Sequence, residues 1–174
     1  RINIFLNDGT TEYKLVNDGA LVPREKQQEM LERIRNAADM THLSISGSLP
    51  QGIEPSYYDE ILAICSERNV RIILDISSTK LRDLLHWNPL LIKPNDEELE
   101  QIFGIRIKKE SDIRKAFDFL HAEGAQNVLL TLGERGAYFS SGSAVYFASA
   151  RPIQLLSSAC AGDAALAAFL SIWL

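Results

Sequence analysis

The apolar and polar positions at the start of this chain follow two different periods. Residues 1–7 and 10–16 alternate around an Asn-Asp-Gly turn, which predicts an antiparallel β-hairpin. Residues 24–38 instead place apolar side chains at helical spacing, with charged side chains between them. The chain therefore opens with a predicted hairpin and an amphipathic helix.

From residue 42 onward, strand and helix patterns take turns. Strands are predicted at 42–46, 70–77, 90–93 and 127–132, helices at 55–69, 79–87, 94–104 and 110–124, then a hairpin at 137–141 and 144–149 and a final helix toward residue 174. The central strands are short apolar runs without clean alternation, which is typical of strands covered on both faces. This order predicts an α/β fold, a mostly parallel sheet between helices, with ligands at the carboxyl ends of the strands.

Composition narrows the class of protein. The 174 residues are 46% hydrophobic and 24% charged, as in an ordinary globular domain, and the net charge is −5. Lys and Arg are scattered among acidic residues, so neither nucleic acid nor a membrane surface is an expected partner. Two cysteines, Cys65 and Cys160, are too few for a disulfide framework, and no apolar run reaches membrane-spanning length. We expect a cytoplasmic protein.

Both ends of the printed sequence lack the usual boundary signals. Residue 1 falls inside a predicted strand, and the last helix reaches residue 174 without a Gly, Asn or Pro to end it. We therefore expect a single α/β domain over residues 1–174 that is incomplete at both ends.

The stretch SSACAGD at 157–163 precedes the final helix and contains one carboxylate, Asp163. A helix start carries free N–H groups and partial positive charge, and small residues such as Ala161 and Gly162 let a phosphate approach that backbone. Such an anion hole beside a carboxylate suits phosphoryl transfer, because the acid can accept the proton of an attacking hydroxyl. Simple capping of the helix by the acid is the alternative.

The stretch LIKPNDEEL at 91–99 is open to two interpretations as well. Asn95 and Glu98 have the spacing of a helix capping box. Lys93 stands at the exit of a strand, where it can meet a phosphate while Asn95 and Glu98 hold a hydrated magnesium ion. The residues alone do not decide between these interpretations.

Two more loops follow predicted strands. In SGSLPQG, Ser46 and Ser48 flank Gly47, and their hydroxyls either bind a sugar or simply turn the chain. In TLGERGA, Thr131 precedes Gly133 and Gly136, and a tight turn competes with backbone approach to a nucleotide. The common phosphate-binding and hydrolase motifs GxxxxGK[ST], GxGxxG, GxSxG and HExxH do not occur in the sequence.

Five stretches in one order, SGSLPQG, IILDIS, LIKPNDEE, TLGERGA and ACAGDAALAAF, resemble the ribokinase-like or PfkB carbohydrate kinases. The resemblance runs over nearly the whole chain. The opening RINI with SGSLP and IKPN is most similar to the branch that phosphorylates sugar phosphates, 1-phosphofructokinase and tagatose-6-phosphate kinase. It implies a ribokinase-like three-layer sandwich with a small β lid, here residues 1–22, which offers edges for a homodimer.

The resemblance also implies roles for individual residues. Asp163 would be the catalytic base, and the backbone of residues 161–163 would form the anion hole. Lys93 would contact the transferred phosphate, and Asn95 with Glu98 would position magnesium through water. The nucleotide pocket would contain Thr131, Gly133 and Gly136, and the sugar phosphate would meet Arg1, Ser46, Gly47 and Ser48.

The implied activity is ATP- and Mg²⁺-dependent phosphorylation of a ketohexose phosphate, with fructose 1-phosphate to fructose 1,6-bisphosphate preferred over tagatose 6-phosphate. The chain departs from the family pattern at Cys160, where glycine is usual, so we expect a changed backbone at the anion hole. A catalytically silent sugar-phosphate or nucleotide sensor with the same fold is the rival interpretation.

Overall fold

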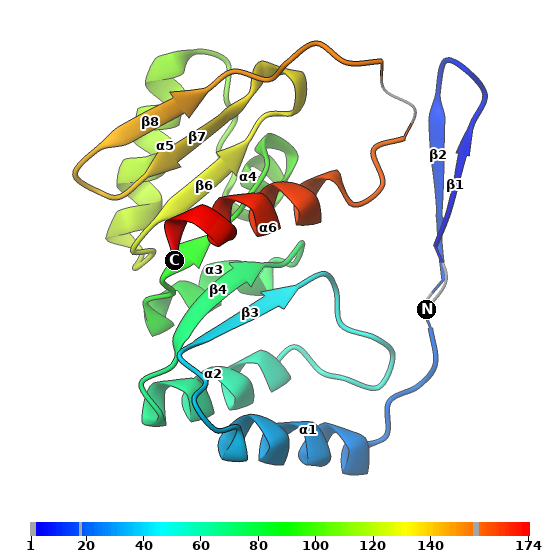
Figure 1. Ribbon diagram of the computed structural model, residues 1–174, viewed down its shortest axis with the longest axis vertical. Coiled ribbons are helices and arrows are strands. Elements are labelled where there is room, and N and C mark those ends of the chain that lie inside the picture. The colour runs from blue at the N-terminus through cyan, green and yellow to red at the C-terminus, as the bar shows by residue number, and fades with distance from the viewer. Residues whose placement is uncertain (1–2, 18, 155–156) are drawn as a thin grey trace.

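The computed structural model describes residues 3–17, 19–154 and 157–174. Strands and helices alternate through the middle of the chain, in the predicted order (Figure 1). The elements are β1 (Asn3–Asn7), β2 (Glu12–Val16), α1 (Arg24–Asn36), β3 (His42–Ser46), α2 (Tyr57–Glu67), β4 (Arg71–Asp75), α3 (Lys80–Leu84), η1 (Leu85–Trp87), β5 (Leu91–Ile92), α4 (Asp96–Phe103), α5 (Glu110–Ala122), β6 (Val128–Thr131), η2 (Gly133–Arg135), β7 (Ala137–Ser140), β8 (Val145–Ala148) and α6 (Ala161–Trp173).

The described strands form a hairpin, β1–β2, and a six-stranded sheet in the order β3-β4-β5-β6-β7-β8. Strands β3 to β6 run parallel, whereas β7 and β8 are antiparallel to their neighbours. The mostly parallel α/β fold expected from the sequence is therefore confirmed. Because β3 to β6 share one direction, their carboxyl ends lie at one edge of the sheet.

The core is divided by the sheet into two layers. Along β4, Ile72 and Leu74 join a cluster that contains side chains of α1 to α5, whereas Ile73 joins a second cluster with Leu166 of α6. Successive strand residues point to opposite faces, so α1 to α5 cover one face and α6 covers the other (Figure 1). The strands β4, β5 and β6 are buried on both faces, as their apolar sequences predicted.

Strand β3 departs from that prediction. It is an edge strand, and its burial alternates between half-buried and exposed positions, with Ser44 exposed. Its apolar residues Leu43 and Ile45 pack against the layer that contains α1 to α5. The sequence HLSIS is thus an alternating strand that is covered on one face.

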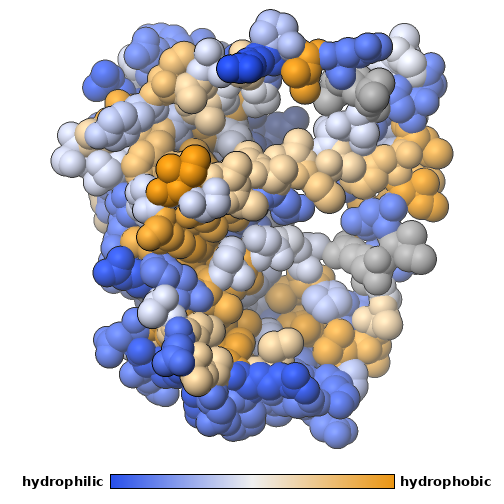
Figure 2. All heavy atoms as spheres, viewed as in Figure 1, coloured by the Kyte–Doolittle hydropathy of each residue, from blue (hydrophilic) through white to orange (hydrophobic). Residues whose placement is uncertain are grey.

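Exposed apolar side chains lie on the hairpin, on β8 and at the end of α6, and Figure 2 shows apolar residues along α6. Register pairs Ile4 with Leu15 and Leu6 with Tyr13, so these four side chains share one face of the hairpin. Each is between 50% and 55% exposed. Among the described helices, none is long and apolar enough to cross a membrane.

Candidate active site

Four strand-exit loops meet at the carboxyl edge of the parallel strands. The amide of Gly47, after β3, donates to the carbonyl oxygen of Asp75 at the end of β4 over 2.9 Å. The amide of Thr131, at the end of β6, donates to the carbonyl of Pro94 over 3.1 Å. Neighbouring loops are thus joined by main-chain hydrogen bonds, which places their side chains along one rim.

A buried ion pair lies at the centre of this rim. Lys93 Nζ is 2.9 Å from Asp75 Oδ1, and the two side chains are 5% and 11% exposed. Burial raises the pKa of the Asp75 carboxyl; Lys93 opposes this shift, and the negative charges of Glu98 and Asp163 add to it. The net direction is upward, so the cost of desolvation outweighs the attraction to Lys93.

Helix α6 begins next to this ion pair. A Cβ added at Gly162 would lie 3.3 Å from Lys93 Nζ, and this is the nearest heavy atom that it would meet. Asp163 is exposed, and its charge acts on Asp75. The structure therefore brings together Lys93, Gly162 and Asp163, which the sequence analysis had placed in two separate loops. A positive helix end, an ammonium group and an exposed carboxylate lie side by side.

The start of α6 depends on an unusual backbone at Cys160. This residue has φ 58° and ψ 13°, in the left-handed region that glycine adopts without strain. A residue with a side chain pays roughly 1–2 kcal/mol there. Cys160 thus adopts a conformation that is typical of glycine, and the expected effect on the anion hole stays a prediction. The amide of Ala161 donates to the carbonyl of Ser158 over 3.2 Å, so one of the three predicted anion-hole donors already has a partner.

Asn95 and Glu98 form the capping box at the start of α4. Asn95 Oδ1 accepts from the Glu98 amide over 2.8 Å, and Glu98 Oε2 accepts from the Asn95 amide over 3.0 Å. The hydroxyl of Ser77 donates to the other oxygen of Glu98. The predicted helix capping box of Asn95 and Glu98 is therefore confirmed.

A role for the same pair in binding magnesium stays a prediction. Among the described residues, no group of three or more His, Cys, Asp or Glu side chains could hold a metal ion. This donor set fits an ion that keeps several waters and takes its other ligands from bound phosphates, which is usual for Mg²⁺. The negative charge of Glu98 acts on Asp75, which indicates that Glu98 lies near the same rim.

The predicted nucleotide residues lie on the next loop. Thr131 ends β6 and bridges to Asn95, and Arg135 forms an ion pair with Asp96, so this loop is joined to α4. Gly136 has φ 94°, and a Cβ there would lie 2.2 Å from the carbonyl oxygen of Ala148. The close approach to β8 supports the interpretation of Gly136 as a turn residue, and its place in a nucleotide pocket stays a prediction.

Gly133 differs from Gly136 in its surroundings. It has φ 58°, but an added Cβ would meet no heavy atom within 4 Å. It therefore lies beside open space next to Thr131. Its place in a nucleotide pocket stays a prediction, and this open space is consistent with it.

The predicted sugar-phosphate residues are placed only in part. Ser46 ends β3, paired in register with Asp75, and Gly47 follows with φ 88°. Ser48 continues the same loop. Arg1 lies outside the described residues, so its predicted contact with a phosphate is not addressed by the structure.

Sequence reasoning missed two residues of this region. Asp75 was passed over within the apolar run IILDIS, although a charge at the end of a buried strand is a signal in itself. Glu12 of β2 accepts from the amide of Ser158 over 3.0 Å and also from its hydroxyl, which joins the hairpin to the loop before α6. The spacing of 146 positions offers no sequence signal for that contact.

A parallel sheet whose carboxyl edge combines a helix N-terminus, a lysine and a free carboxylate is typical of α/β proteins that bind phosphorylated ligands. The family model described as "pfkB family carbohydrate kinase" matches residues 1–174. The chain belongs to this family of carbohydrate kinases.

Individual relatives agree with the family. A D-tagatose-1-phosphate kinase of Klebsiella oxytoca is 53% identical over 174 residues, which is 100% of this chain and 57% of that protein. A 1-phosphofructokinase of Bacillus subtilis is 30% identical over 98% of this chain and 56% of its own length. The structure of phosphofructokinase-2 from Escherichia coli with substrates and products has 25% identity and a TM-score of 0.86, over 97% of this chain and 57% of that one. The chain thus spans little more than half the length of these relatives.

Proposed function

We propose that the protein containing this chain transfers the γ-phosphoryl group of ATP to a hydroxyl of a ketohexose phosphate. The observation that carries this proposal is the meeting of Lys93 with the start of α6 beside the exposed carboxylate of Asp163. A cation and main-chain donors that converge next to a solvent-accessible base provide what phosphoryl transfer asks of a protein.

In this proposal Asp163 accepts the proton of the sugar hydroxyl. The hydroxyl oxygen forms a bond to the γ-phosphorus while the bond between the γ-phosphorus and the ADP oxygen breaks. The amides at the start of α6 and the ammonium of Lys93 stabilise the charge on the phosphoryl oxygens. Magnesium would neutralise phosphate charge, and Asn95 and Glu98 would orient its waters. Thr131, Gly133 and Gly136 would line the nucleotide site. Ser46, Gly47 and Ser48 would face the sugar.

The experiment that tests this function measures ADP release by the full-length protein with D-tagatose 1-phosphate, fructose 1-phosphate, tagatose 6-phosphate and fructose 6-phosphate. Asp163→Asn keeps the size of the side chain but removes the base. Its kcat should fall by roughly 10²–10⁴-fold with little change in substrate affinity. An Asp163→Asn protein that keeps the wild-type kcat would disprove the assignment of the base.

We favour a ketohexose 1-phosphate as the acceptor, which would yield a 1,6-bisphosphate. The relative with 53% identity is named a D-tagatose-1-phosphate kinase. The relative with 30% identity is named a 1-phosphofructokinase. D-Tagatose 1-phosphate therefore becomes the first candidate, ahead of the fructose 1-phosphate that the sequence motifs favoured. The ratio of kcat/KM values for the two sugars decides between them.

The silent sensor remains the second candidate function because of Cys160. Its left-handed backbone, which glycine also adopts without strain, lets the chain turn into α6, and this supports the kinase over the sensor. Tight binding of the sugar phosphates with no ADP release from any of them would reverse that preference.

We also propose a cytoplasmic homodimer that pairs through the lid, residues 1–22. The apolar face of Ile4, Leu6, Tyr13 and Leu15 supports this, because a second hairpin would cover side chains that are now half exposed. Both cysteines are free thiols, in keeping with a reducing compartment. Light scattering of the full-length protein and of its Leu6→Glu variant tests the dimer, and a wild-type monomer would contradict it.

A further inference from the structure

The loop at 47–52 is held at both of its ends, and the two attachments differ in kind. At its start, Gly47 donates to the main chain of Asp75, within the rim of the site. At its far end, Gly52 is held by a side chain from another element, Gln27 of α1. This second attachment belongs to none of the roles described above.

Gln27 is a buried polar residue, only 5% exposed. Both the nitrogen and the oxygen of its side-chain amide form hydrogen bonds. Its Nε2 atom donates to the carbonyl of Val22 over 2.9 Å and to the carbonyl of Gly52 over 2.7 Å. Its Oε1 atom accepts from Arg24 over 3.2 Å. Both hydrogens of one amide nitrogen are therefore used to join two separate chain segments.

The two segments also meet directly. The amide of Val22 donates to the carbonyl of Gln51 over 2.9 Å. Gly52 has φ 85°, and a Cβ there would lie 2.7 Å from the side chain of Leu21 and 3.0 Å from the carbonyl of Val22. The connector that leads from the hairpin into α1 is thus pressed against the end of the 47–52 loop.

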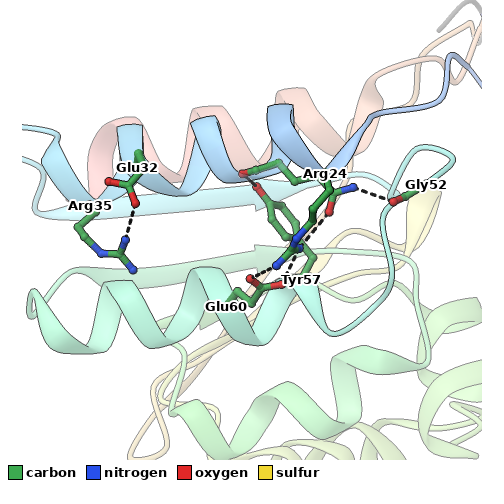
Figure 3. A network of polar contacts seen from close by, with 7 residues as sticks. Arg24, Glu32, Arg35, Gly52, Tyr57 and Glu60 are labelled. Atoms are coloured by element: carbon green, nitrogen blue, oxygen red, sulfur yellow. Dashed lines mark hydrogen bonds and ion pairs between the residues drawn. The ribbon is translucent and has the colours of Figure 1, made fainter.

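Gln27 itself is held firmly in place. The hydroxyl of Tyr57 on α2 donates to the main-chain carbonyl of Gln27 over 2.8 Å. An ion pair between Arg24 and Glu60 lies beside this hydrogen bond (Figure 3). A residue that only filled space would not need an amide here, since a methionine or leucine occupies a similar volume. Among side chains of this length, only an amide nitrogen can donate to two carbonyls at once without carrying a charge.

We propose that Gln27 is a positioning residue that couples the hairpin to the sugar-binding loop, an inference that rests on the proposed function. The hairpin connector, residues 19–23, and the 47–52 loop move as one unit because a single amide holds both carbonyls. Hairpin position then sets where Ser48 presents its hydroxyl, whereas Ser46 is held in β3 by its pairing with Asp75. The nucleotide loop at Thr131 is attached to α4, through the bridge to Asn95 and the ion pair between Arg135 and Asp96, and it stays outside this coupling.

The test uses Gln27→Met in the full-length protein, which keeps the volume and removes both donors. KM for D-tagatose 1-phosphate or fructose 1-phosphate should rise roughly tenfold, while KM for ATP and kcat change less than about twofold. Gln27→Asn, which keeps an amide but cannot span both carbonyls, should behave in the same way. Glu60→Gln is the matched control, because it breaks the ion pair at the same place and leaves the amide bonds intact; its KM values should match wild type.

A second measurement needs no catalytic activity. Hydrogen exchange at the amide of Val22, which bonds to Gln51, should be at least about tenfold faster in Gln27→Met than in wild type or Glu60→Gln. Unchanged exchange, or KM values that rise equally for sugar and ATP, would overturn the coupling. Absence of kinase activity in the wild-type protein would contradict the proposed function alone, because the exchange result still decides the role of Gln27.

Discussion

Replacing Asp75 by alanine tests the centre of the rim most directly. The substitution removes one member of a buried pair whose atoms are 2.9 Å apart and leaves Lys93, 5% exposed, without its counter-ion. Removing one partner of such a pair costs about 3–5 kcal/mol. We expect the free energy of unfolding of the full-length protein to fall by an amount in this range, measured by urea denaturation.

The pKa of Asp75 sharpens this expectation. It is raised mainly by burial, despite the attraction of Lys93, so the folded protein holds the ionised carboxylate at a cost. The pair as a unit is then not a strong source of stability, and the loss in Asp75→Ala comes from the lysine left unpaired. Exchanging Lys93 as well, in an Asp75→Ala/Lys93→Met double variant, should recover at least half of that loss.

Asp75→Asn provides a graded control, because the amide oxygen can still accept a hydrogen bond from Lys93 Nζ but carries no charge. The free energy of unfolding of Asp75→Asn should lie between the values for wild type and Asp75→Ala. Two results together would refute the ion pair. The free energy of unfolding of Asp75→Ala would be less than about 1 kcal/mol below that of wild type, and the loss in the double variant would equal the sum of the two single losses. The stability measurements require no knowledge of the substrate.

Three further predictions follow from local geometry. Gly136→Ala should lower the free energy of unfolding by about 2 kcal/mol or more, because its Cβ would lie 2.2 Å from a main-chain oxygen. Gly133→Ala should lower it by only about 1 kcal/mol, because its Cβ would meet no heavy atom within 4 Å. Urea denaturation measures both values. Cys160→Gly should gain roughly 0.5–1 kcal/mol in the same assay by relieving its left-handed backbone, and a loss would contradict the strain. Hydrogen bonds from Ser158 hold the pKa of Glu12 below its ordinary value of 4.5, so this contact persists above pH 4.5 and is lost as pH falls through the lowered pKa. An NMR titration that gives the Glu12 carboxyl a pKa of 4.5 or higher would contradict this last contact.

The order of elements and the shared edge of the sheet could be predicted because they depend on local pattern and on the rules of parallel sheets. Lys93 ends one strand region, and Asp163 opens a helix after the last strands, so a parallel α/β fold places both at the carboxyl edge. The Asp75–Lys93 pair and the Gln27 bonds could not be predicted in this way. They depend on which side chains meet across segments, and a single sequence contains no signal for that.

The geometry of two ambiguous stretches supports one of their interpretations in each case. Asn95 and Glu98 were open to capping or to magnesium binding, and the capping bonds are formed at 2.8 Å and 3.0 Å. The two roles are compatible, because a capping box fixes both side chains at the start of α4 and leaves carboxylate lone pairs for a water. Gly136 is different, since its contact with β8 already explains the glycine.

Cys160 shows how far a departure from a motif can be interpreted without a structure. The sequence predicts a changed backbone there because a side chain replaces glycine before the anion hole. In the structure Cys160 takes φ 58°, a conformation that glycine adopts without strain, and its side chain is exposed. A strain of roughly 1–2 kcal/mol is small beside the stability of a folded domain, which is typically 5–15 kcal/mol. A cysteine at this position therefore lowers stability by a small amount, and its effect on the proposed activity stays a prediction.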